Sequence, residues 1–151
     1  MIDGVRVKKL KVIPDERGKL MEILRADDDL FTKFGQVYIT SVHPGVVKAW
    51  HCHQKQIDHF TCISGNIKLV LADLRPGSAT ERQTQEFFIG EDNPQLVQIP
   101  AGVHHVIKCI GDRTALALNV PNETYDHVNP DEQRLPFDTE LIDYDWEIRH
   151  G

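Results

Sequence analysis

The fold of this chain is decided by residues 45–65, which read Gly45-Val-Val-Lys-Ala-Trp-His51-Cys-His53-Gln-Lys-Gln-Ile-Asp58-His-Phe-Thr-Cys-Ile-Ser-Gly65. Alternate side chains of a strand share a face, so His51 and His53 are expected to point the same way. A short turn can return Asp58 to that face, and Pro100-Ala-Gly102-Val-His104-His105 supplies a further histidine. Three imidazoles and one carboxylate can bind a divalent metal, or supply a base and its orienting partner.

Composition indicates a soluble globular protein of 151 residues, with 40% hydrophobic and 26% charged residues. The net charge of −6 disfavours nucleic-acid and anionic-membrane partners. No stretch approaches the roughly 18 apolar residues of a membrane helix, and the first residues lack the apolar core of a signal peptide. Three cysteines without Cys-x-x-Cys spacing favour a reducing compartment. We therefore expect one cytoplasmic domain over residues 1–151.

Alternation of period two predicts an all-β protein. The expected strands are 5–13, 19–24, 35–42, 46–53, 58–64, 66–73, 84–89, 95–99, 104–110 and 113–120. Many short strands separated by Gly, Pro and Asp turns are typical of a sandwich or barrel. Gly65 looks like a hairpin turn between two of these strands, and only residues 26–34 look helical.

The composition changes after Pro121 to Asp, Asn, Glu and Pro. We expect this tail to wrap over the barrel rather than to form a second domain. Its apolar anchors would be Leu135, Phe137, Leu141, Ile142 and Trp146.

Two stretches resemble the paired motifs of the cupin superfamily. The first is glycine, five residues, His-x-His, four residues, an acid, six residues and glycine, which residues 45–65 match with Asp58 in place of the usual glutamate. The second, Pro-x-Gly-x-x-His, is met by Pro100, Gly102 and His105. The resemblance implies a double-stranded β-helix, the cupin jelly-roll barrel, followed by the short C-terminal wrap.

A longer series of segments resembles the dTDP-4-dehydrorhamnose 3,5-epimerase family. Asp15-Glu-Arg17-Gly18-Lys-Leu20-Met-Glu22 is similar to that family's Asp-x-Arg-Gly-x-Phe-x-Glu, and Lys48-Ala-Trp-His51 to its Arg-Gly-Leu-His. The same order continues through residues 72–80, 91–93, 99–105 and 137–138. The resemblance therefore spans nearly the whole chain.

The resemblance implies a homodimer, joined by strand exchange at the N-terminus, that acts without metal on a nucleotide-linked 4-keto-6-deoxy sugar. The ketone acidifies the neighbouring carbons, so a histidine base can remove a proton and leave an enolate. His51 would be that base, Asp138 would orient it, and Lys48 would stabilise the enolate. The implied substrate and nucleotide contacts are Arg17, Glu22, Gln36, Arg75 and His105.

The chain departs from this family at informative positions. Asp58 stands where the family has lysine, His53 where it has glutamine, and Leu118 near its acid-donating tyrosine. The first two changes restore the metal-ligand pattern of other cupins. Together the departures favour inversion of one centre, keto-isomerisation, or a metal-assisted version of either, over strict 3,5-epimerisation.

Three functions remain open from the sequence. The first is a nucleotide-sugar epimerase or isomerase without a cofactor. The second is a metal-dependent cupin isomerase or oxygenase, in which Zn, Fe, Mn or Ni is held by His51, His53, Asp58 and His105. The third is a sugar-binding cupin without catalytic activity. His51 cannot both bind a metal through its catalytic nitrogen and act as the base.

Overall fold

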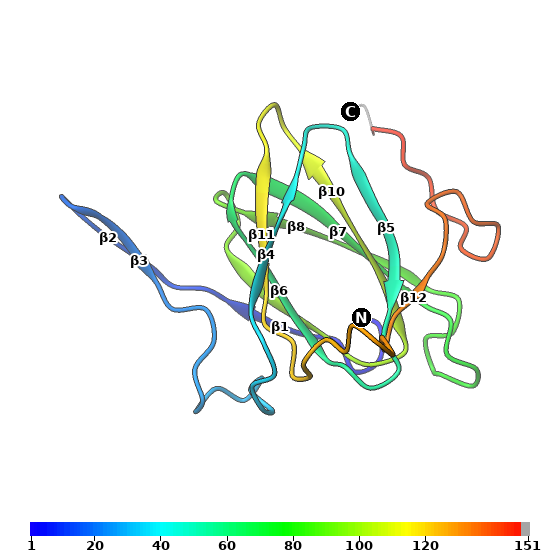
Figure 1. The fold of residues 1–151 in the computed structure, drawn as a ribbon. Coiled ribbons are helices and arrows are strands. Elements are labelled where there is room, and N and C mark those ends of the chain that lie inside the picture. Colours follow the sequence, from blue (N-terminus) through cyan, green and yellow to red (C-terminus); the bar gives the residue numbers. More distant parts are fainter. Residues whose placement is uncertain (149–151) are drawn as a thin grey trace.

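A computed structural model describes residues 1–148 as two five-stranded antiparallel sheets that face each other, with a separate two-stranded hairpin (Figure 1). The first sheet has the order β1 (Arg6–Lys9), β9 (Gln95–Ile99), β6 (Asp58–Ser64), β11 (Ala115–Asn119), β4 (Tyr38–Val42). The second has the order β12 (Gln133–Arg134), β5 (Val47–Cys52), β10 (Val103–Ile110), β7 (Asn66–Asp73), β8 (Thr84–Gly90). This arrangement confirms the predicted all-β jelly roll. No helix that could cross a membrane occurs in residues 1–148.

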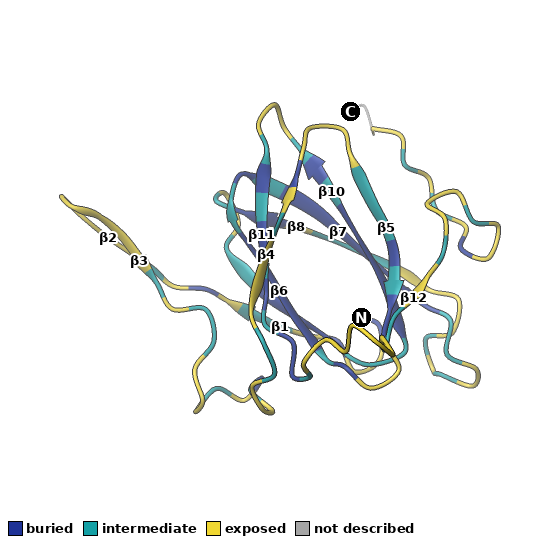
Figure 2. Cartoon of the chain, in the orientation of Figure 1, coloured by how far each residue is buried: buried dark blue, intermediate teal, exposed yellow. Residues whose placement is uncertain are grey.

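The main core lies between the two sheets, where the inward side chains of both meet. Strands β6, β7, β9 and β10 carry most of the buried residues (Figure 2). Phe60, Leu69, Leu71 and Ile99 are each at most 4% exposed and belong to one apolar cluster. Burial of such side chains is the dominant stabilising term in folding. The cluster therefore holds the sheets together and fixes the position of side chains at their ends.

The C-terminal segment covers the outer face of the second sheet, as the sequence predicts. Trp50 is fully buried there, with its ring 6.3 Å from Tyr144 and 5.9 Å from Trp146. Ile142 and Leu135 pack in the same cluster. Phe137 and Leu141, however, are 52% and 66% exposed, so the prediction that they anchor the wrap is wrong.

Residues 26–30 form turns and residues 31–34 are irregular, in place of the expected helix. The Asp28 carboxylate accepts hydrogen bonds from the Arg25 backbone N–H at 2.8 Å and from Lys8 Nζ. Such side-chain bonds compete with the helical backbone ladder, which explains why a helical composition gives no helix here.

Gly65 is not the turn of a hairpin. Strand β6 pairs with β9 and β11, whereas β7 pairs with β8 and β10, so the chain changes sheets at this residue. Gly65 has φ +71°, and a Cβ there would lie 3.1 Å from the Ala115 Cα. Only glycine meets both requirements without strain.

An arm of two strands, β2 (Val12–Asp15) and β3 (Gly18–Met21), stands away from the barrel (Figure 1). The expected strand 5–13 is thereby divided, with β1 in the barrel and β2 in the arm. Ile13 and Leu20 of the arm are 47% and 57% exposed. An arm that exposes apolar side chains is typical of a segment that packs against another molecule.

Candidate functional site

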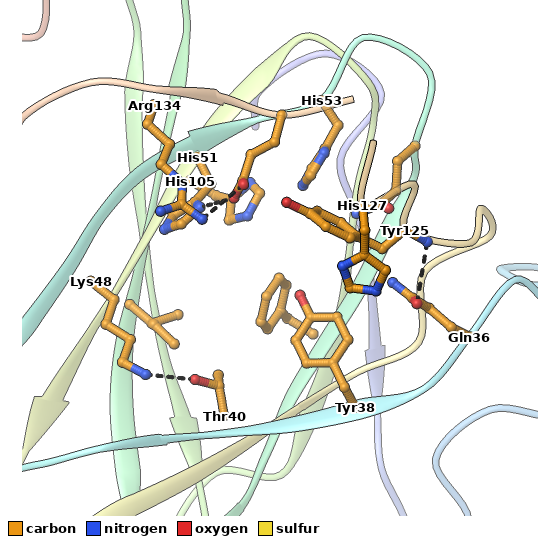
Figure 3. A pocket seen from close by; sticks show the side chains of 14 residues that line it. Gln36, Tyr38, Thr40, Lys48, His51, His53, His105, Tyr125, His127 and Arg134 are labelled. Atoms are coloured by element: carbon orange, nitrogen blue, oxygen red, sulfur yellow. Dashed lines mark hydrogen bonds and ion pairs between the residues drawn. The ribbon is translucent and has the colours of Figure 1, made fainter. Parts of the chain in front are cut away.

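A cavity of about 410 Å³ opens between the two sheets at the end where the histidines gather (Figure 3). Strand β5 contributes Lys48 and His51, and β4 on the facing wall contributes Tyr38 and Thr40. The remaining lining residues come from strands β6, β10 and β12, from the loops before β4 and after β5, and from the segment after the barrel: Gln36, His53, Gln56, Phe60, His105, Ile107, Tyr125, His127, Glu132 and Arg134. A cavity of this size and mixed lining suits a small ligand.

His51 is held by Glu132. Strand β12 pairs with β5 in a register that places Arg134 opposite His51, and this brings the Glu132 Oε1 to 2.6 Å from the His51 Nδ1. Burial opposes ionisation of Glu132, but hydrogen bonds from Arg134 and His51 outweigh it and lower the pKa of this carboxyl. An ionised carboxylate can only accept hydrogen bonds, so the His51 Nδ1 donates to Glu132. The His51 Nε2 is then unprotonated whenever the His51 ring is neutral.

His105 lies beside His51 on the neighbouring strand, with ring centroids 5.9 Å apart. Burial lowers the pKa of His105 to about 4, so the ring is neutral near pH 7. Its Nδ1 is buried without a hydrogen-bond partner among the described residues.

His53, Asp58 and His105 form a buried group whose possible ligand atoms all lie within 4.8 Å of one another. The Asp58 Oδ2 is 3.8 Å from the His53 Nε2 and 3.9 Å from the His105 Nε2. The other Asp58 oxygen accepts from Gln56 at 2.8 Å and from Asn119 at 2.7 Å. Two nitrogens and one oxygen, with the carboxylate oriented by further hydrogen bonds, are a donor set that fits a divalent metal.

The structure does not include His51 in that group, which corrects the predicted set of four ligands. The Asp131 carbonyl oxygen accepts a hydrogen bond from the His53 Nδ1, and this leaves the His53 Nε2 toward Asp58. His51 instead turns its Nδ1 to Glu132. In this geometry His53, Asp58 and His105 can hold a metal while His51 remains free to act as the base. The sequence had suggested that metal binding and a His51 base exclude each other.

Lys48 lies where its ammonium group borders the cavity. Its Nζ donates to the Thr40 Oγ1 at 2.7 Å, which ties β5 to β4 across the barrel (Figure 3). Gln36 reaches the same cavity, and its Oε1 accepts from the Tyr125 backbone N–H at 3.3 Å. His51, Lys48, Gln36 and His105 are thus brought together as the sequence predicts.

Four other predicted site residues lie elsewhere. Asp138 is exposed in the C-terminal wrap, and Glu132 occupies the position expected for it beside His51. Arg17 and Glu22 belong to the arm region and pair with Asp15 and Arg25, outside the cavity of their own chain.

Arg75, the fourth, makes a structural ion pair rather than a cavity contact. Its Nε and Nη2 bind the two oxygens of the buried Asp73 at 2.8 and 2.7 Å. Ser78 and Thr80 donate to the same carboxylate. Arg75 therefore lies outside the cavity of its own chain, and its contact with the substrate stays a prediction.

Four residues of the cavity were not predicted from the sequence: Glu132, Arg134, Tyr38 and His127. The first two follow an irregular Asn-Pro-Asp segment, where no periodicity indicates which side chain points inward. Tyr38 had a usable signal, because it alternates with Thr40 on an expected strand and both line the cavity.

Comparison with known proteins gives the wider context. Residues 13–133 match the sequence profile of the polysaccharide biosynthesis C-terminal domain family. The chain is 41% identical over 146 residues to the spore coat polysaccharide biosynthesis protein SpsL of Bacillus subtilis, covering 97% of each. It is 42% identical over 153 residues to the probable low-salt glycan biosynthesis epimerase Agl13 of Haloferax volcanii, covering 99% of this chain and 98% of Agl13.

Two solved structures of sugar-modifying enzymes have the same fold as this chain. The dTDP sugar isomerase of Desulfovibrio desulfuricans superposes with a TM-score of 0.91 and 32% identity, covering 96% of this chain and 92% of that protein. NovW, a 4-keto-6-deoxy sugar epimerase of Streptomyces spheroides, has a TM-score of 0.87 over 97% of this chain and 76% of NovW, and at 22% identity it supports the fold alone. The chain belongs to the polysaccharide biosynthesis C-terminal domain family, as a divergent relative of the dTDP-sugar epimerases and isomerases.

Proposed function

We propose that this protein is an epimerase or isomerase of a nucleotide-linked 4-keto-6-deoxy sugar, with His51 as the base. The observation that carries the proposal is the His51–Glu132 pair, with its Nδ1–Oε1 distance of 2.6 Å, at the wall of the cavity. A base oriented by a carboxylate is the arrangement that proton abstraction requires. Relatives named as a probable glycan biosynthesis epimerase and a dTDP sugar isomerase support the same chemistry.

The reaction follows from the acidity of carbon beside a ketone. His51 Nε2 takes the proton from that carbon, and Glu132 stabilises the imidazolium that results. Lys48 borders the cavity and supplies positive charge for the enolate oxygen. Return of a proton to the other face of the carbon inverts it, whereas its return to the neighbouring carbon would isomerise the sugar.

The nucleotide-linked sugar is proposed from two features. The Desulfovibrio relative is described as an isomerase of a dTDP sugar. Arg134 lies at the cavity with its side chain 67% exposed, and its guanidinium suits a phosphate oxygen. Gln36 and His105 are proposed to contact the sugar.

A homodimer is part of the proposal. Arg17 and Glu22 cannot serve the cavity of their own chain from their observed positions, yet the arm that carries Arg17 exposes the apolar side chains of Ile13 and Leu20. We place the arm of each chain at the cavity of its partner, where Arg17 would meet the nucleotide. The cytoplasm is the proposed location, and the three buried free thiols are consistent with it.

A metal-dependent enzyme is the second candidate, favoured by one specific observation. His53, Asp58 and His105 converge as a buried donor group, and they would hold a divalent ion beside the base. Such an ion would supply Lewis-acid stabilisation to an oxygen of the ligand. Elemental analysis of protein purified without added metal distinguishes the candidates. The favoured function predicts activity that does not change with metal content, and the second predicts one ion per chain whose removal abolishes activity.

The test of the favoured function is turnover of dTDP- and UDP-linked 4-keto-6-deoxyglucose, followed by NMR of the sugar. Wild-type protein should form an epimer or keto-isomer, and His51→Gln should lower the rate by about 100-fold or more. His43→Gln is the matched control, because His43 is an exposed histidine on the turn before β5 that bonds Thr114. Equal activity of wild-type protein and His51→Gln would exclude His51 as the base, and no turnover by wild-type protein would support a binding role.

A further inference from the structure

Inversion at a carbon needs a proton donor on the face opposite to the base. His51 comes from β5 in one sheet, and Tyr38 comes from β4 at the edge of the other sheet. Both side chains line the cavity, and Figure 3 shows the Tyr38 hydroxyl pointing into it from the wall that faces His51 and His105. The two residues therefore stand on opposite sides of the space a ligand would fill.

The hydroxyl of Tyr38 is oriented by Asn119. The Asn119 Oδ1 accepts the His59 backbone N–H at 2.9 Å, so the amide cannot be turned around without losing this bond. Its Nδ2 then donates to the Asp58 Oδ1 at 2.7 Å and to the Tyr38 oxygen at 3.0 Å. Because the phenolic oxygen accepts from Asn119, the Tyr38 proton remains available, and it has no acceptor among the described residues of the chain.

This placement explains the leucine found near the position of the family's tyrosine. In strand β11, Ala115, Ala117 and Asn119 are buried while Leu116 and Leu118 are partly exposed, so Leu118 belongs to the outer face. Asn119, the residue after Leu118, faces the inside of the barrel, and Tyr38 on β4 is paired directly with it. Paired residues of neighbouring antiparallel strands share a face. A phenol is thus present at this wall, supplied by the adjacent strand.

The environment of Tyr38 keeps its proton in place until a strong base forms. Burial raises the pKa of Tyr38, against a smaller opposing effect of the Asn119 hydrogen bond, and nearby carboxylates add to the rise. The phenol is therefore protonated near neutral pH. An enolate carbon is basic enough to draw such a proton, and the Asn119 N–H that donates to Tyr38 can stabilise the phenolate that remains.

We propose that Tyr38 is the catalytic acid that completes inversion, an assignment that rests on the proposed function. When His51 has taken a proton from one face, the Tyr38 O–H bond breaks as a new C–H bond forms on the opposite face. The enolate electrons form that bond as the ketone is restored, and the O–H electron pair stays on the phenolate. Water then returns a proton to Tyr38 and accepts one from His51, so the enzyme is unchanged.

The experiment separates abstraction of the proton from its return. Wild-type protein and Tyr38→Phe are incubated in D₂O with dTDP- or UDP-linked 4-keto-6-deoxyglucose, and NMR measures deuterium in the recovered substrate and the amount of inverted product. Tyr38→Phe should keep deuterium uptake within about threefold of wild type, through return to the same face by His51, while inverted product falls about 100-fold or more. The ratio of the two signals does not depend on the fraction of folded protein.

Two further variants sharpen the result. Tyr144→Phe removes a tyrosine hydroxyl in the C-terminal wrap, outside the cavity, and should leave the ratio at the wild-type value. Tyr125→Phe tests the other cavity tyrosine. The assignment is overturned if Tyr38→Phe inverts at the wild-type rate, if it loses exchange and inversion equally, or if Tyr125→Phe alone loses inversion. Absence of any exchange by wild-type protein would instead overturn the proposed function, and the assignment with it.

Discussion

At the scale of single residues, the identity of the group beside His51 is the clearest difference between expectation and structure. Alternation on a strand places His51 on the face of His53, whereas Lys48 is predicted from the resemblance alone. Lys48 is three residues from His51, and both reach the cavity where the pairing of β5 with β10 shifts register between them. The sequence does not predict Glu132, because residues 126–132 follow no regular pattern and the resemblance points to Asp138. A local period cannot show which residue of an irregular segment meets a distant strand.

Glu132→Gln should therefore lower turnover by about 100-fold or more, since the amide no longer holds the His51 ring or stabilises its charged form. Asp138→Asn is the matched control and should stay within about twofold of wild type, because Asp138 is exposed away from the cavity. Steady-state rates of both variants on the same substrate show which carboxylate orients His51. The opposite order of effects would restore Asp138 as the orienting residue.

The Asp73 carboxylate is predicted to matter for stability rather than for turnover. It is fully buried, and Arg75, Ser78 and Thr80 all donate to it. These hydrogen bonds hold the pKa of Asp73 well below its usual range, although burial alone would raise it. The bond from Arg75 has the largest effect. A lowered pKa stabilises the fold at every pH above the unfolded value of about 3.9, and the contribution is lost as pH falls toward the folded value.

Asp73→Asn should accordingly lower the free energy of unfolding at pH 7 by about 2–4 kcal/mol, because Arg75 loses its partner. It should also flatten the decline in stability between about pH 5 and pH 3. Urea unfolding across this range measures both effects. Asp27→Asn, which breaks an exposed ion pair with Arg25, is the control and should change little. Equal loss in both variants would contradict the role given to Asp73.

At the scale of elements, the strands were predictable and their partners were not. Most of the expected strands agree with the structure apart from their ends, because half-buried strands alternate in polarity. The exceptions are informative. Gly65 marks a change of sheet, and residues 5–13 divide where the arm leaves the barrel. Both depend on contacts with distant strands, which no local pattern encodes.

Gly35 joins two elements that carry cavity residues. Gly35 and Gln36 donate backbone N–H groups to the Pro121 carbonyl at 3.0 and 3.2 Å. A Cβ on Gly35 would lie 2.3 Å from the Glu123 carbonyl carbon, so Gly35→Ala must push the segments apart. We expect a loss of about 1–3 kcal/mol in stability and a rise in KM larger than the fall in kcat, because Gln36 and Tyr125 are displaced.

Gly45→Ala provides the control for this prediction. Gly45 has φ +76°, and no atom lies within 4 Å of the position that a Cβ would take there, so alanine adds backbone strain far from the cavity. Its stability should fall by about 1–2 kcal/mol while KM stays at the wild-type value. Thermal melts and steady-state kinetics of the two variants give the comparison. An unchanged KM in Gly35→Ala would show that the contact is only structural.

At the scale of the whole molecule, the paired motifs predicted the jelly roll because they specify two histidine-bearing segments at one end of a barrel. One domain over residues 1–151 remains a prediction. The assembly is also a prediction, because a single chain leaves the arm of residues 12–21 without a partner surface. If the arm of each chain reaches the cavity of its partner, a complete site forms only in the dimer.

Mixing two damaged chains tests the exchange. Arg17→Ala and His51→Asn chains should each be poorly active at substrate concentrations below KM. After unfolding and refolding together, about one quarter of all sites would combine an intact cavity with an intact arm. Activity near that fraction of wild type is the expected result, together with a dimer mass by light scattering. Mixed protein no more active than the two separate preparations would contradict arm exchange.

His51 is proposed to remove a proton from the carbon next to a ketone. Its most direct test is deuterium uptake in D₂O by a nucleotide-linked 4-keto-6-deoxy sugar, measured by NMR with chelator-treated protein. With wild-type protein we expect deuterium to enter the sugar at the carbon beside the ketone, and we expect His51→Asn to lower this rate about 100-fold or more. Uptake by wild-type protein only after a metal is restored would favour the metal-dependent candidate. Uptake that persists unchanged in His51→Asn would contradict the role of His51 as the base.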